Sequence, residues 1–162
     1  MYLFPIGILL GTLIGIIIDR RISAKERERF RESVESRLDK MTSFYFLLIK
    51  WLSCSQKGDK LARYFDSRGY RTVAIYGMKE LGVSLLEELR DSGIDVIYGI
   101  DKDADNIYVP LDIYKPEETL IIVDAVVVTA VAYFDDIKKQ LERKVNCPIV
   151  SLEEVIDYMN NV

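Results

Sequence analysis

Residues 72–82 read TVAIYGMKELG, and this stretch decides the fold. Its first five residues, Thr72–Tyr76, are mostly apolar or β-branched and stop at Gly77, which predicts a β-strand. From Lys79 to Leu89 apolar residues recur at helical spacing, before a further glycine ends the pattern. A strand followed at once by a helix is the repeating unit of a parallel α/β sheet.

The rest of the C-terminal region continues this alternation. We expect further strands at Asp95–Ile100, Ala125–Thr129 and Pro148–Val150, and a short one at either Asn106–Val109 or Leu111–Tyr114. Helices are expected at 60–67, at 134–143 and after the capping box SLEE of residues 151–154. This order indicates a three-layer α/β sandwich with a mostly parallel sheet, in a domain spanning residues 58–162.

The turn after the first strand carries a chemical motif. A Rossmann domain has G-x-G-x-x-G here, where backbone amides at the start of the helix face a phosphate. Gly77 and Gly82 match the first and third glycines, which favours a Rossmann-like sandwich. Lys79 replaces the second glycine, so it either blocks a diphosphate or pairs with a phosphate. Asp101, 24 residues after Gly77, is either a ribose ligand or one of several solvated carboxylates.

Residues 2–18, YLFPIGILLGTLIGIII, form an uncharged run directly before Asp19-Arg20-Arg21. As a helix this run would measure roughly 25 Å, enough to cross the apolar core of a bilayer. The positive charges follow the run, unlike those of a secretory signal peptide, and a buried core helix is the other alternative. We therefore expect a transmembrane helix at 1–19 in the cell membrane, crossed once, with the C-terminal domain in the cytoplasm.

Residues 20–57 predict a helical stalk, whose basic start suits contact with anionic membrane lipid. Apolar residues recur along it at steps of three or four, forming one stripe: Phe30, Val34, Leu38, Met41, Tyr45, Leu48 and Leu52. Gly7, Gly11 and Gly15, at GxxxG spacing, predict a smooth face for close helix contact. The helical segment therefore predicts a homo-oligomer or a protein partner.

Composition argues against several kinds of site. The 162 residues include no histidine, and Cys54 and Cys147 lack metal-ligand spacing, so we expect no metal site. The Tyr-x-x-x-Lys pattern of short-chain dehydrogenases occurs at Tyr98–Lys102, where it runs off a strand into a turn, and we expect no catalytic residue. A net charge of −4, with an acidic C-terminal region, argues against nucleic-acid binding.

Four stretches of the sequence resemble one family: RTVAIYGMKELG (71–82), VIYGIDKDAD (96–105), VDAVVVTA (123–130) and CPIVSLEEVI (147–156). They are similar to the Rossmann-like, non-catalytic module of bacterial membrane-associated nucleoside-diphosphate-sugar epimerases and dehydratases of capsular polysaccharide biosynthesis. The resemblance covers Leu61 to Tyr158. It implies a nucleotide or nucleotide-sugar pocket at Gly77, Met78, Gly82, Asp101 and the loop after Thr129. It also implies an envelope-biosynthesis protein as a possible partner.

Three functions are alternatives on these grounds. The leading one is a membrane-anchored module that binds a nucleotide or nucleotide sugar, with Lys79 in the same pocket, in cell-envelope polysaccharide biosynthesis. The second is an NAD(P)-dependent enzyme of the epimerase or dehydratase type, or a subunit that borrows catalytic residues from a partner. The third is a ligand-free scaffold for protein contacts.

Overall fold

The computed structural model describes residues 4–58 and 60–161, with side chains described from residue 25 onward. The chain divides between Phe44 and Tyr45 into two units. The second unit holds a five-stranded sheet in the order β3-β2-β1-β4-β5, and every neighbouring pair of strands is parallel. This confirms the predicted α/β class, and the sheet is consistent with a Rossmann-like sandwich.

The strands follow the predicted pattern closely. They are β1 (Thr72–Tyr76), β2 (Asp95–Ile100), β3 (Ile113–Tyr114), β4 (Ala125–Val128) and β5 (Ile149–Ser151). The third strand thus falls within the second of the two expected positions. β1 lies at the centre of the sheet, because it pairs with both β2 and β4.

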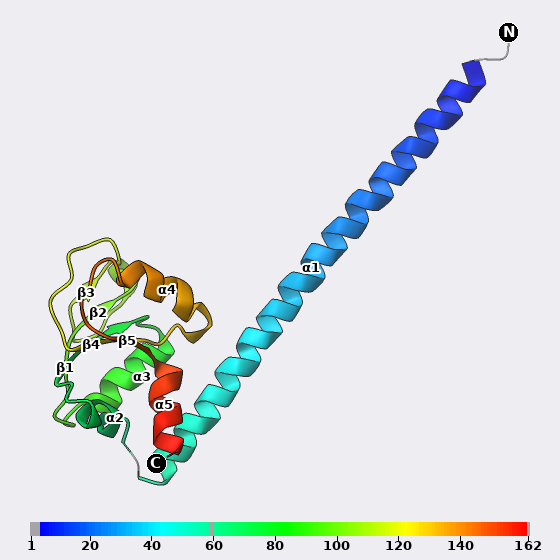
Figure 1. Ribbon diagram of the computed structural model, residues 1–162. Helices are drawn as coiled ribbons and strands as arrows, with labels where there is room; N and C mark the ends of the chain where they lie inside the picture. Colours follow the sequence, from blue (N-terminus) through cyan, green and yellow to red (C-terminus); the bar gives the residue numbers. More distant parts are fainter. Residues whose placement is uncertain (1–3, 59, 162) are drawn as a thin grey trace. The chain divides into compact units, whose positions relative to one another are not determined.

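Short helices lie before, between and after these strands (Figure 1). They are α2 (Ala62–Ser67), α3 (Glu80–Leu89), α4 (Phe134–Leu141) and α5 (Leu152–Asn160), with 3₁₀ turns at Ala104–Asn106 and Val131–Tyr133. The start of α5 has the predicted N-cap, since the amide of Glu154 donates to Oγ of Ser151 at 3.0 Å.

Alternation along the strands builds two cores, one on each face of the sheet. Val73 and Ile75 of β1 pack among residues of α2, α3 and α5. Ala74 and Tyr76 face the other way and pack with residues of α4. Because successive side chains of a strand point to opposite faces, a sheet covered on both sides needs the continuous apolar run that β1 and β4 supply.

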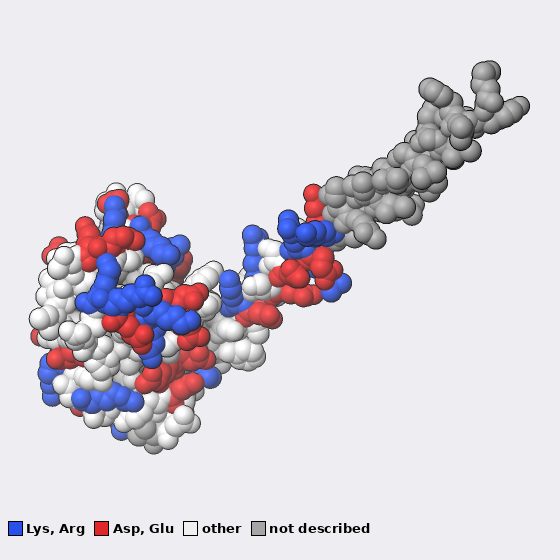
Figure 2. Space-filling model, turned by 45° about the horizontal axis from the view of Figure 1, so that its top comes forward, with Lys and Arg blue, Asp and Glu red and all other residues white. Residues whose placement is uncertain are grey.

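The first helix, α1 (Phe4–Gln56), is 53 residues long. Acidic and basic side chains are interspersed along its described charged part (Figure 2), and Arg31 lies within 3.9 Å of Glu28 and 3.6 Å of Glu35. Among the described residues, we find no helix with the length and apolar character needed to cross a membrane. The uncharged run 2–18 and Gly7, Gly11 and Gly15 lie outside the residues whose side chains are described.

The last turns of α1 belong to the second unit. Leu47, Trp51 and Cys54 are buried in the core on the α3 side of the sheet. This unit therefore begins at Tyr45, although the sequence placed the start of the domain at residue 58. Lys50 adds an exposed ion pair by donating to Asp157 of α5 at 2.7 Å, and this hydrogen bond raises the pKa of Lys50.

Glu88 of α3 joins the end of α1 and the segment before α2 to α3. One carboxylate oxygen accepts a short hydrogen bond from Nε1 of Trp51, and the other accepts the backbone amide of Leu61 at 3.0 Å. Both donors come from buried residues. A single carboxylate therefore satisfies two groups that would otherwise lose their hydrogen bonds to water.

We expect Glu88→Ala to lower the free energy of unfolding by about 1–3 kcal/mol, because two donors lose their acceptor. Glu87→Ala is the matched control: Glu87 is exposed and pairs with Arg90 on the same helix, and such pairs contribute about 0.5 kcal/mol or less. Denaturant unfolding followed by circular dichroism measures both. Equal losses in the two variants would contradict this role for Glu88.

Candidate functional site

The turn between β1 and α3 is held by two glycines. Gly77 has φ +93°, a conformation that favours glycine, and its amide donates to the carbonyl of Ile100 at 2.8 Å. Gly82, in the first turn of α3, lies so close that an added Cβ would overlap the carbonyl of Gly77. The helix therefore approaches the end of β1 as the third glycine of a Rossmann turn permits.

Thr129 closes the other side of this turn. Its Oγ1 donates to the carbonyl of Gly77 at 2.5 Å and lies 3.1 Å from that of Tyr76. A Cβ on Gly77 would come within 2.7 Å of the same Oγ1. The contact lies between the ends of β1 and β4, where the strand order reverses and where ligands of open parallel sheets bind.

Asp101, at the end of β2, is turned toward the protein. It is 8 % exposed, and its two carboxylate oxygens accept the amides of Met78 at 2.8 Å and Asp103 at 3.0 Å. The side chain of Met78 is buried, and a Cβ on Gly99 would meet it at 2.7 Å. Asp101 therefore holds the glycine turn in place, whatever else it binds.

Five of the six predicted site residues are thus brought together by direct contacts or hydrogen bonds: Gly77, Met78, Gly82, Asp101 and Thr129. Lys79 lies near them because it directly follows Met78 in the sequence. It precedes the first residue of α3 in an extended conformation, and its side chain is exposed. Among the described residues, no salt bridge includes Lys79.

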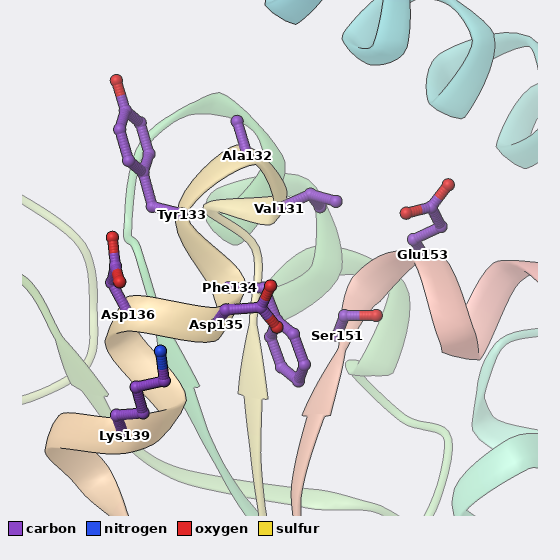
Figure 3. Close-up of a pocket in the computed structure, with 9 residues that line it drawn as sticks. All are labelled: Val131, Ala132, Tyr133, Phe134, Asp135, Asp136, Lys139, Ser151 and Glu153. Carbon is purple, nitrogen blue, oxygen red and sulfur yellow. The ribbon is translucent and has the colours of Figure 1, made fainter.

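Beyond Thr129 the surface forms an open hollow of about 500 Å³ (Figure 3). It is lined by Val131, Ala132, Tyr133, Phe134, Asp135, Asp136, Lys139, Ser151 and Glu153. The lining includes three carboxylates and one ammonium group, so the hollow is acidic. The loop after Thr129 was predicted from the sequence, whereas the contributions of α4, β5 and α5 to the lining were not. Their one sequence signal, the pair Asp135-Asp136, is also what the start of a helix favours.

Tyr76 has the one buried side-chain polar atom without a hydrogen-bond partner among the described residues. Burial raises the pKa of this hydroxyl, and the nearby carboxylates of Asp101 and Glu117 raise it further. The hydroxyl is therefore protonated at neutral pH. A buried polar group of this kind is commonly satisfied by an internal water.

The tyrosine of the Tyr-x-x-x-Lys match has a different setting. Tyr98 is buried, and its hydroxyl donates to the carbonyl of Ile121 at 2.8 Å. Burial raises the pKa of Tyr98 to about 12. Its hydroxyl is thus committed to the backbone before β4. Within the described part of the chain, no group of three or more His, Cys, Asp or Glu side chains is placed to hold a metal ion.

Comparison with known proteins adds nothing to this geometry: no protein family, curated protein or solved structure matches the chain.

We expect Gly77→Ala to destabilise the fold more than Gly69→Ala. Both glycines have positive φ, +93° and +73°, so both substitutions strain the backbone by about 1–2 kcal/mol. Only at Gly77 does the new methyl group meet Thr129, because the space around Gly69 is open, and overpacking adds about 1–3 kcal/mol. Thermal unfolding of the two variants measures the difference, and equal midpoints would show that the turn relaxes freely.

Proposed function

We propose that residues 45–162 bind a nucleotide or nucleotide sugar at the carboxyl edge of the parallel sheet. The observation that carries this proposal is the glycine turn at the strand-order reversal, with Gly82 against Gly77 and Lys79 exposed at the start of α3. Backbone amides at such a helix start favour a phosphate, and an ammonium group without an ion-pair partner strengthens that preference.

The residues present fit a nucleotide sugar better than an intact dinucleotide. Lys79 adds a side chain where the backbone would have to approach the diphosphate of NAD(P). The hollow after Thr129 carries three carboxylates, which would repel phosphate but accept hydrogen bonds from the hydroxyl groups of a sugar. A nucleotide sugar with its diphosphate near Lys79 and its sugar in the hollow matches this distribution of charge.

A ribose contact with Asp101 remains compatible with its structural hydrogen bonds. Each carboxylate oxygen has two lone pairs, and each accepts one amide from its own chain. A bound ribose would therefore add a hydrogen bond to Asp101 and would leave the bonds to Met78 and Asp103 in place. The side chain is 8 % exposed, which restricts such a contact to one edge of the carboxylate.

The cellular setting is part of the same proposal. The uncharged run 2–18 anchors the chain in the cell membrane by one crossing, and the folded unit lies in the cytoplasm. The resemblance to modules of capsular polysaccharide biosynthesis supports a role in assembling cell-envelope polysaccharide. In this role the unit acts as a binding or regulatory module.

Lys79→Gly distinguishes the ligands. The full-length chain in detergent is titrated calorimetrically with uridine diphosphate glucose and with NAD⁺. We expect the variant to bind the nucleotide sugar roughly tenfold to a hundredfold more weakly, because a charge-assisted hydrogen bond is lost. The same change restores G-x-G-x-x-G and should create or strengthen NAD⁺ binding. Lys57→Gly, a change in the turn after α1, is the control and should leave both affinities unchanged. If neither the natural chain nor either variant binds one of the two probes, the ligand-free scaffold replaces this proposal.

Membrane anchoring is tested separately by fractionation. We expect full-length protein to stay with the membranes after a carbonate wash and to need detergent for extraction, because residues 2–18 expose no charge to the bilayer core. A chain that lacks residues 1–21 should be recovered without detergent. Full-length protein in the carbonate-washed supernatant would contradict the anchor.

A further inference from the structure

One face of α1 carries exposed apolar side chains that no described residue covers. We define the seam as the six residues Val34, Leu38, Met41, Tyr45, Leu48 and Leu52, whose exposed fractions lie between 38 % and 69 %. Exposed apolar side chains on the surface of a protein in water are usually scattered singly. A continuous stripe of six on one helix face therefore marks an interaction site.

The seam is separate from the face that holds α1 to the second unit. At 100° per residue, Tyr45, Leu48 and Leu52 lie roughly 130° around the helix from Leu47, Trp51 and Cys54. The latter three are buried in the core of the second unit. Packing within the second unit therefore leaves Tyr45, Leu48 and Leu52 exposed.

The spacing of the seam identifies the shape of its partner. Its steps are four, three, four, three and four residues, so each pair of successive steps spans seven residues, which is the heptad repeat of 3.5 residues per step. Such a repeat keeps one face of a helix against another helix with the same repeat, in knobs-into-holes packing. The seam therefore fits a helix that bears a matching seam.

We propose that the seam pairs with the seam of a second copy of this chain, in a parallel and in-register two-stranded coiled coil. The pairing is isologous, since each residue of the seam meets its own counterpart. This proposal goes beyond nucleotide-sugar binding and does not depend on it.

The residues that flank the seam favour the parallel direction. In a parallel two-stranded coiled coil, each g position of the heptad faces the e position five residues later in the partner helix. With Tyr45 at an a position, Phe44 is at g and meets Ile49, which is at e. Both are exposed, at 42 % and 46 %, and the pairing would cover them on both sides of the seam. The antiparallel alignment that sets Leu38 opposite Leu48 would instead place Ile49 beside Glu35.

Charge agrees with this direction. Two further flanking pairs of a parallel alignment are Arg37 with Thr42 and Phe30 with Glu35, and neither pair sets like charges opposite one another. Arg31 occupies the next seam position toward the N-terminus, within 4 Å of Glu28 and Glu35 of its own helix. The coiled coil therefore begins near Val34.

The mass of the full-length chain in detergent, from sedimentation equilibrium, tests the pairing. We expect two copies for the natural chain and one for the double variant Leu38→Glu with Met41→Glu, because both changes bring charges into the seam. Ser36→Glu with Ser43→Glu is the control: it adds the same charge to the opposite face of the helix and should leave two copies. A single copy for the natural chain overturns the proposal, as does a double variant that still forms dimers.

Cross-linking tests the direction and register. In a parallel in-register pair, Leu38→Cys places two thiols against each other, so mild oxidation should link most of the protein as dimers. Ser36→Cys, on the opposite face, should link no more than the natural chain, which retains the buried Cys54 and half-buried Cys147. Equal linking of the two variants would overturn the parallel arrangement. Both positions lie outside the second unit, so its unfolding midpoint should be unchanged in every variant.

Discussion

The close approach of α3 to the end of β1 is the constraint on which the C-terminal unit depends. Gly82 lies against the carbonyl of Gly77, and neither position has room for a side chain. Because β1 is the central strand, this approach sets the path of the first crossover between β1 and β2. Thr129 and Asp101 then hold the turn from its two sides, one at a carbonyl and the other at an amide.

Asp101 shows why the same residue can serve the fold and a ligand. Its carboxylate accepts the amides of Met78 and Asp103, so the side chain that holds the turn also lies where a ligand would arrive. Removing the carboxylate would therefore loosen the turn and alter the pocket together. Lys79 differs in this respect, because its exposed side chain contributes no described ion pair to the fold. A substitution there separates binding from stability.

The strands and the turn were predictable because their signals are local. β1 and β2 coincide with apolar or β-branched runs that end at a turn, and Gly77 and Gly82 lie five residues apart. β3 was ambiguous because it has two residues and pairs with β2 through Gly99 and Ile100 alone. The hollow was missed because its lining comes from the separate segments around α4, β5 and α5, which only the crossover connections bring together.

The end of α1 shows the limit of a periodicity argument in a different way. The stretch from Phe44 to Ile49 is apolar nearly all round, so the pattern allows more than one buried face. The apolar stripe that the sequence shows most clearly contains Tyr45 and Leu48, whereas the residues that the second unit buries are Leu47 and Trp51.

The hydrogen bonding of buried polar groups decides which of these faces is buried. Trp51 has an indole N–H that needs an acceptor when buried, and Glu88 supplies one. Rotating the last turns of α1 to bury the stripe would break this hydrogen bond and leave the indole N–H of Trp51 without its acceptor. The polar contact therefore fixes the rotation of the last turns of α1 and leaves Tyr45 and Leu48 exposed.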